Sequence, residues 1–595
     1  MGPIDPALPQ LCRQASSLQQ QGQPVAAASL WRQALELDPS NAALHINLAL
    51  CLKRSGHPSQ ALALLQEGRE RCAPHPLLLS NLASLLLAAN DPNAALHCCR
   101  QALELDPSCG PALANHASAL AELGEWQATI EAAQRCLQHL PQCAEAHMAW
   151  GLGLQGSGDY EGARQQAETA LAINPLLHQA HSNLGNALRL LKRPAEALEA
   201  LDRCVELAPD WPQGQVNLGI GLFESGEIPA AIEAYRRALA LAPEQPEALA
   251  NLAIALQELG HTDDAIHHYR QAIQRRPDYP EARFGLGTAL LSQGDWQEGL
   301  ALYDWRFKLR DQELTIAPEG LPQADEHQLQ RPRRLLVVDE QGIGDTLQFC
   351  RHLPALAAQG HQLRFSVPTK LHGLLERAGL NAELVDFPAP PDAIAASDAW
   401  LPLMSLPHLL QRNPAAAHPP YLQADPKRVQ HWRRRLRRSR PLIGLSWQGN
   451  PAQEKLAGRS MPFEALAGLA AIPQLDFLSL QRGAGEEQLA ACSFRERFIP
   501  EQESLSAIWA FEEIAAIMLS CDWIVSVDTA TAHLAGGLGC PTWLLLKHTP
   551  EWRWGLEGEH CGAYPSLRLL RQRQPGDWAE LVQRLTAALS REVAA

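Results

Sequence analysis

A glycine-containing loop ends in an aspartate that could do acid–base chemistry. The apolar run 335–338 is followed by Gly342, Gly344, Asp345 and Thr346, and a helical pattern begins near Thr346. An aspartate at this point either caps the helix, by accepting hydrogen bonds from its exposed amides, or removes a proton from a bound hydroxyl group as a general base. Both roles use the same loop, so the sequence keeps both interpretations open.

A second aspartate precedes a helix that could bind an anion. Asp528 and Thr529 come directly after the apolar run 523–527, and His533 lies four residues beyond Thr529. The free amides of a helix N-terminus and its partial positive charge attract groups such as phosphate. We therefore predict an anion site at Asp528 and Thr529. His533 either belongs to that site or packs beneath it as a neutral imidazole.

Short apolar runs must position these side chains. Besides 335–338 and 523–527, such runs occur at 442–447, 477–480 and 542–546, separated by about 10–30 residues of helical pattern. This alternation predicts parallel, doubly wound sheets, and ligands of such sheets bind beyond the carboxyl ends of the strands. The candidate ligand-binding residues at those ends are Gln448, Gly449 and Asn450 after the run 442–447, Gln481 and Arg482 after 477–480, and Asp528, Thr529 and His533 after 523–527.

The first half of the chain is a repeat. A proline recurs every 34 residues, at Pro107, Pro141, Pro175, Pro209, Pro243 and Pro277. Small residues stand where two helices must touch, and a glycine column falls between them, where a left-handed backbone is needed. These columns resemble the tetratricopeptide repeat, which forms an α-solenoid of helix-turn-helix units with a concave groove. We expect eight or nine units over residues 1–310.

One polar column points toward that groove. An amide offers a donor and an acceptor, so a ladder of amides either holds a peptide backbone or bridges adjacent repeats. The first arrangement resembles the superhelix of protein O-GlcNAc transferases. The column consists of Asn47, Asn81, Asn115, Asn183, Asn217 and Asn251.

The second half resembles glycosyltransferase family nine, the heptosyltransferases, and in particular bacterial proteins that fuse this family to tetratricopeptide repeats. The likeness rests on residues 342–346 and 528–533 and spans about residues 333–590. It implies a GT-B fold of two Rossmann-like halves, an acceptor half over 333–430 and a nucleotide-sugar half over 431–595, after a linker over 311–332.

The same resemblance implies roles for the candidate residues. Asp345 matches the base that takes the proton of the acceptor hydroxyl, within an acceptor loop that includes Gly342, Gly344 and Thr346. The segment 528–533 faces the donor, and Lys455 and Arg459 match the basic donor-binding position, although both could simply be solvated. Because the chain has no Asp-x-Asp triplet, we expect no metal and no cofactor, so protein charges must stabilise the leaving diphosphate.

Three features remain ambiguous at the level of sequence. The family has glycine two places after the donor aspartate, whereas this chain has Ala530, which leaves the donor identity open. The segment 552–554, Trp-Arg-Trp, either stacks on a planar ligand or pins the C-terminal helices to the sheet. The basic run 427–440 either grips an anion or forms a solvated helix between the two halves.

Composition excludes several classes of protein. The net charge of -15 argues against wholesale nucleic-acid binding, which depends on neutralising phosphates. Fourteen cysteines form no Cys-x-x-Cys pair, and no apolar run approaches the length of a membrane span. We expect a protein of the reducing cytoplasm, with no integral membrane segment.

The sequence favours one function and leaves two alternatives. The first is a metal-independent, inverting glycosyltransferase whose repeats recruit a polypeptide or glycan acceptor. The second is an interaction scaffold whose GT-B domain has lost turnover. The third is a chaperone adaptor that clamps carboxylates, which the asparagine column disfavours because such a clamp needs Lys and Arg.

Overall fold

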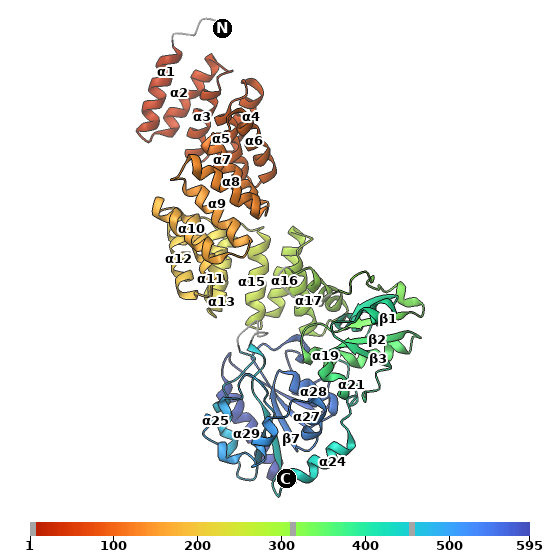
Figure 1. Ribbon diagram of the computed structural model, residues 1–595. Helices are drawn as coiled ribbons and strands as arrows, with labels where there is room; N and C mark the ends of the chain where they lie inside the picture. Colours follow the sequence, from red (N-terminus) through yellow and green to blue (C-terminus); the bar gives the residue numbers. More distant parts are fainter. Residues whose placement is uncertain (1–6, 310–316, 452–457, 595) are drawn as a thin grey trace. The chain divides into compact units, whose positions relative to one another are not determined.

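The computed structural model describes residues 7–309, 317–451 and 458–594, which form two compact units. The first unit is Met1–Pro243 and the second is Glu244–Ala595 (Figure 1). The sequence places the end of the repeat array at residue 310, whereas the units divide within the array. The last repeats belong to the second unit because Leu300 and Tyr303 share one apolar core with the first sheet.

Helices of 13 residues alternate with helices of 14 residues throughout the first unit. The array continues in the second unit with shorter final elements. The helices of the first unit are α1 (Leu8–Gln20), α2 (Pro24–Leu37), α3 (Ala42–Arg54), α4 (Pro58–Arg71), α5 (Pro76–Ala88), α6 (Pro92–Leu105), α7 (Gly110–Glu122), α8 (Trp126–His139), α9 (Ala144–Gly156), α10 (Tyr160–Ile173), α11 (His178–Leu190), α12 (Pro194–Leu207), α13 (Pro212–Glu224) and α14 (Ile228–Leu241). Those of the second are α15 (Pro246–Glu258), α16 (Thr262–Arg275), α17 (Pro280–Gln293), α18 (Trp296–Tyr303) and η1 (Asp304–Lys308).

The turn inside each helix pair explains the glycine column. A residue there needs a left-handed backbone, which glycine adopts without strain. Asn90 and Lys192 occupy the same position in two repeats that lack glycine, and both have φ of 61°. The prediction of helix-turn-helix repeats is confirmed by the predicted glycines, whose φ values run from 75° to 88°: Gly56, Gly124, Gly158, Gly226, Gly260 and Gly294.

The second unit contains two sheets whose strands are all parallel, as the spacing of the apolar runs predicts. The first sheet has the order β3-β2-β1-β4 and the second has the order β6-β5-β7-β8-β9. Their central strands are buried on both faces. The strands are β1 (Arg334–Val338), β2 (Gln362–Val367), β3 (Ala382–Asp386), β4 (Ala399–Pro402), β5 (Leu442–Ser446), β6 (Asp476–Ser479), β7 (Trp523–Val527), β8 (Thr542–Leu546) and β9 (Leu567–Arg571).

Mostly short helices connect these strands. Of the helices in the described residues, none has both the length and the apolar character needed to cross a membrane. The connecting helices are α19 (Ile343–Phe349), α20 (Leu353–Ala357), α21 (His372–Leu375), α22 (Pro391–Ala395), α23 (Leu406–Leu409), α24 (Pro426–Arg435), α25 (Gln488–Ala491), α26 (Gln502–Ser506), α27 (Phe511–Met518), α28 (Ala530–Leu538) and α29 (Trp578–Ala594), with the 3-10 turns η7 (Phe463–Ala471) and η9 (Trp552–Trp554).

The basic run between the two sheets forms α24 and the segment after it. Arg428 pairs with Glu513, which also accepts a hydrogen bond of 2.5 Å from the indole of Trp432. Arg438 pairs with Glu501. The first pair attaches α24 to α27, and the second attaches the segment after α24 to the residue that precedes α26. These contacts favour the interpretation of the run as a connecting helix.

Candidate functional site

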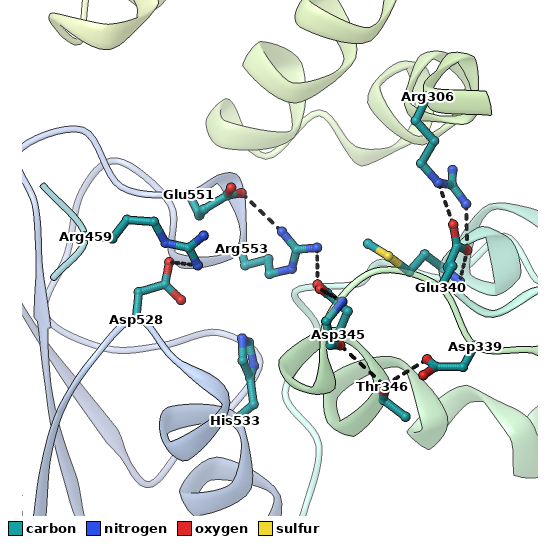
Figure 2. Close-up of polar contacts among 12 residues, drawn as sticks. Arg306, Asp339, Glu340, Asp345, Thr346, Arg459, Asp528, His533, Glu551 and Arg553 are labelled. Atoms are coloured by element: carbon teal, nitrogen blue, oxygen red, sulfur yellow. Dashed lines mark hydrogen bonds and ion pairs between the residues drawn. The ribbon is translucent and has the colours of Figure 1, made fainter. Parts of the chain in front are cut away.

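The N-terminal ends of α19 and α28, which follow strands of different sheets, lie against each other. Gly344 approaches His533 so closely that an added Cβ would lie 2.9 Å from the imidazole Cδ2 and 3.6 Å from the Cα of Ala530. Glycine is needed at position 344 for this approach. The loops after β1 and β7 therefore meet, which brings Asp345 and Asp528 into one region of the molecule (Figure 2).

Asp345 makes two kinds of contact. Its Oδ2 accepts a hydrogen bond of 3.2 Å from the backbone N–H of Gly342, the residue that caps α19. Its Oδ1 accepts one of 2.5 Å from the guanidinium of Arg553. The helix thus begins at Ile343, three residues before the predicted start, because the Asp345 side chain caps it. Asp345 is therefore observed to cap the helix. Its role as a general base stays a prediction, and the capping contact is compatible with it.

Arg553 joins the two sheets. It lies on η9, after β8, and donates to Asp345 and, over 3.1 Å, to Glu551. Its side chain is only 7% exposed, and its Nε has no hydrogen-bond partner among the described residues. Burial works to lower the pKa of Arg553, but the carboxylates of Asp345 and Glu551 outweigh burial and raise it, so the guanidinium stays charged.

A second ion pair, with a buried carboxylate and a guanidinium that is 34% exposed, lies on the nucleotide side predicted by the sequence. Arg459 donates to Asp528 over 3.0 Å, and the Asp528 side chain is 7% exposed. Burial opposes the charge of Arg459, while Asp528 and, further on, Glu551 raise its pKa. Thr529 occupies the N-cap position of α28, as predicted. Asp528 and Thr529 therefore stand at a helix N-terminus beside a guanidinium, an arrangement that suits a phosphate group.

His533 is a buried, neutral side chain of α28. Its Nδ1 lies 3.1 Å from the hydroxyl of Tyr564, and its ring stacks on Trp554 with centroids 4.9 Å apart. Burial above all lowers the pKa of His533 to about 3. These contacts favour the interpretation in which His533 packs beneath the site, between Trp554 and Gly344.

The amide residues after β5 and β6 bind mainly to each other. Gln481 is 3% exposed and its Nε2 donates to the carbonyls of Gln448 and Ala484, at 2.8 and 2.7 Å. Its Oε1 accepts from backbone amides at the end of β5. Gln481 therefore shapes the loop that carries Gln448 and Asn450. Lys455, predicted as a donor-binding cation, lies outside the described residues.

The tryptophans of η9 pack against aromatic neighbours, and the arginine between them makes the ion pairs with Asp345 and Glu551. Trp552 packs edge-on against Tyr303, with centroids 5.7 Å apart, and Trp554 packs on His533. Packing is thus the role that the structure gives both indoles. Sequence reasoning singled out the tryptophans and missed Arg553. The sequence signal that could have identified Arg553 is its position between two tryptophans, shortly after the apolar run 542–546.

Buried polar groups support the loop that contains Asp345. Thr346 is fully buried and donates to Asp339 over 2.8 Å, and burial raises the pKa of Asp339 to about 7. Glu340 makes a bidentate pair of 2.9 Å bonds with Arg306, and both side chains are 0% exposed. Arg306 belongs to η1, directly after the last repeat helix. The repeat array therefore anchors the strand end that leads to Asp345.

Contacts within the asparagine column are of two kinds. Asn115 donates over 2.9 Å to the carbonyl of Ser80, and Asn217 donates over 2.7 Å to the hydroxyl of Ser182, so both bridge neighbouring repeats. Asn81 bonds within its own helix. Bridging is thus observed at two positions, and peptide binding by the column stays a prediction. The other members, all half-buried, are Asn47, Asn183 and Asn251.

Comparison with known sequences shows what the first half is. Signatures described as "Tetratricopeptide repeat" match residues 18–83, 80–147, 148–212 and 251–304, and one described as "TPR repeat" matches residues 222–260. Residues 18–304 therefore carry tetratricopeptide repeats. The chain is also 30% identical, over 289 residues, to Protein FlbA of Caulobacter vibrioides, covering 44% of this chain and 46% of FlbA.

Two solved structures match the chain at low similarity. The APC/C hetero-tetramer Cut9-Hcn1 matches at 19% identity and a TM-score of 0.40, over 47% of this chain and 55% of that one. A tetratricopeptide repeat protein of Parabacteroides merdae matches at 16% identity and a TM-score of 0.35, over 42% and 100%. The chain spans about half the length of FlbA and of the Cut9-Hcn1 chain.

Proposed function

We propose that this protein is a metal-independent, inverting glycosyltransferase that uses a nucleotide-sugar donor. One observation carries the proposal: Asp345 of the first sheet meets Arg553 of the second, beside the Arg459–Asp528 pair (Figure 2). Transfer of a sugar needs a base for the acceptor and positive charge for the leaving group. These side chains include both kinds of group. The resemblance to glycosyltransferase family nine supports the same reaction and the GT-B arrangement of the two sheets.

Each residue then has a defined task. The carboxylate of Asp345 takes the proton of the acceptor hydroxyl, whose oxygen forms a bond to the anomeric carbon of the donor sugar. The bond between that carbon and the diphosphate oxygen breaks, and its electron pair leaves with the nucleoside diphosphate. Arg459, Arg553 and the N-terminus of α28 neutralise the charge that develops there. A general base contributes about 10²- to 10⁴-fold to such a rate.

The repeats recruit the acceptor. Tetratricopeptide arrays bind extended partners along stacked helices, which supports a polypeptide as the acceptor class, with a glycan as the alternative. The pair Arg306–Glu340 connects the last repeat to the strand end before Asp345, so the partner-binding array and the reacting loop share one framework. This connection favours transfer to a partner that the repeats hold.

A ligand screen tests the donor site. The wild-type protein is melted with UDP, ADP, GDP or TDP and, as controls, with the corresponding nucleosides. We expect one diphosphate to stabilise it, by about 2.7 kcal/mol at 100 times Kd, whereas its nucleoside does so less. Arg459→Gln should raise the Kd for that diphosphate about tenfold or more, because it removes a charge-assisted hydrogen bond to the ligand. Arg334→Gln is the matched control, since Arg334 is half-exposed and pairs with Asp398.

Transfer is then measured with the sugar of the selected nucleotide and a library of peptides as acceptors. Asp345→Asn should lower the transfer rate about 10²- to 10⁴-fold with the fold intact. If the folded wild-type protein binds none of the four diphosphates, the proposal is wrong.

The second candidate is a scaffold that binds partners without sugar transfer. The tetratricopeptide repeats over residues 18–304 favour it, as does the fact that both oxygens of Asp345 already accept hydrogen bonds. Partner capture with no transfer of any of the four sugars, by a protein that binds the nucleotide, would support the scaffold.

A further inference from the structure

The pair Asp345–Arg553 is a largely buried ion pair. Its side chains are 19% and 7% exposed. Removing two charges from water costs several kcal/mol per ion, so such pairs are often no better than apolar residues of the same size. The pair also engages the one carboxylate that the proposed reaction needs as a base. Its position therefore points to a role in the reaction cycle.

The charges around this pair are unbalanced. Arg459 and Arg553 give two formal positive charges, while Asp345, Asp528 and Glu551 give three negative ones, which leaves one excess negative charge. Electrostatic effects on Arg459 come from Asp528, Glu551, Arg553 and Asp345, so the five groups share one field. A bound anion would have to draw a guanidinium away from a carboxylate in order to be accommodated.

Arg553 is placed to make that exchange. Its neighbour Trp554 stacks on His533 of α28, which sets Arg553 near the helix end that carries Asp528. Its Nε is a buried donor without a partner among the residues that the structure describes. A guanidinium offers donors in a planar fork that matches phosphate oxygens, and Figure 2 shows it between the Arg459–Asp528 pair and Asp345.

We propose, on the basis of the donor site proposed above, that Arg553 is a diphosphate ligand that lies on Asp345 only while the donor is absent. When the nucleotide sugar binds, the guanidinium moves from the carboxylate to the diphosphate. Donor binding thereby uncovers the base, so the acceptor hydroxyl meets a free carboxylate only after the donor is in place. The donor is consequently the first substrate to bind productively.

This exchange predicts an effect that a purely structural ion pair would not produce. Asp345 competes with the diphosphate for Arg553, so removing its charge should strengthen diphosphate binding. The affinity of Arg553 for Asp345 and its affinity for the diphosphate are linked. Coupling of this kind usually changes a binding affinity by a factor of about 5 or more. A structural pair predicts the reverse, because its loss would loosen the site.

The test is calorimetric titration of the full chain with whichever of UDP, ADP, GDP and TDP binds wild type most tightly. We expect Asp345→Asn to lower Kd at least about fivefold and Arg553→Gln to raise it about tenfold or more. In the Arg553→Gln background, Asp345→Asn should change Kd by less than about twofold. The guanidinium for which Asp345 and the diphosphate compete is absent there. Glu551→Gln, at a side chain 38% exposed, should also lower Kd.

Controls separate the exchange from damage to the fold. Asp398→Asn removes the carboxylate of another Asp–Arg pair in the same sheet, Asp398–Arg334, and should leave Kd unchanged. An Asp345→Asn or Glu551→Gln protein that melts like wild type but binds the diphosphate no more tightly would overturn the exchange while leaving the donor site intact. A wild-type protein that binds no diphosphate would overturn the proposed function and this inference together.

Discussion

The contact between Gly344 and His533 makes a prediction about Gly344→Ala. The added Cβ would lie 2.9 Å from the imidazole Cδ2, whereas carbon atoms pack best at about 3.5–4.0 Å. The ends of α19 and α28 must therefore separate by roughly 0.6–1 Å, since His533 is fixed between Tyr564 and Trp554 and has no room to turn. Forcing an extra methyl group into such packing costs about 1–3 kcal/mol.

Thermal melting measures this cost. We expect the Tm of the second unit, Glu244–Ala595, to fall by about 1–4 °C. An unfolding entropy of about 2.1 cal/mol/K per residue makes 1 kcal/mol worth about 1.4 °C in a unit of this size. Because Asp345 follows Gly344 directly, the separation also moves the carboxylate relative to the second sheet. In the proposed reaction, a displacement of about 1 Å lowers the transfer rate about 100-fold.

A double variant identifies the clash as the cause. His533→Ala removes the ring, so Gly344→Ala should cost less than about 0.5 kcal/mol in that background. Gly468→Ala is the control, since its added Cβ would meet the nearest atoms at 3.5 Å, an ordinary contact. Equal destabilisation by Gly344→Ala with and without the imidazole would refute the reasoning.

Three further outcomes follow from buried polar groups. Glu340→Gln removes one of the two carboxylates that neutralise the buried guanidinium of Arg306, the other being Asp304, and should destabilise the second unit by about 3 kcal/mol, measured by urea unfolding. Burial raises the pKa of Asp339 to about 7, so the folded state holds a proton that the unfolded state loses above about pH 4. Stability from this group is therefore lost as pH rises from about 4 to 7, and Asp339→Asn should raise Tm relative to wild type more at pH 8 than at pH 5. Asn115→Ala should cost about 1 kcal/mol by removing its bond to Ser80, which melting of the first unit would detect.

The sequence predicted the elements whose pattern is repeated along the chain or extends over several consecutive residues. Repeat boundaries recur at a fixed period, so an irregular repeat such as that of Lys192 does not hide them. Strands β1, β5, β6, β7 and β8 are apolar along most of their length because helices or other elements cover both faces. Strands β2, β3, β4 and β9 were not predicted. The residues of β3 are half-buried or exposed, and β9 exposes Arg568, so neither has a continuous apolar run.

The candidate site was predicted where one loop contains the whole signal. Asp345 and Asp528 each follow a strand and lie at the start of a helix, and the residues on either side of each aspartate are enough to predict this position. Arg553 escaped because its partner Asp345 is 208 residues away, so only the folded chain pairs them. Gln481 was assigned to ligand binding by its place after a strand, but its amide turns inward to backbone groups that sequence cannot locate.

The tie between the last repeat and the first sheet determines where the chain can be divided. A fragment that begins at residue 333, where the sheet signals start, would strip Arg306 from the buried carboxylate of Glu340 and Tyr303 from the ring of Trp552. It would also remove Glu258, which holds Lys547 at the end of β8. Because it lacks these contacts, we expect such a fragment to aggregate. A division after Pro243 leaves all three contacts whole. Recombination at that point could replace the first unit without disturbing the contacts around Asp345 and Arg553.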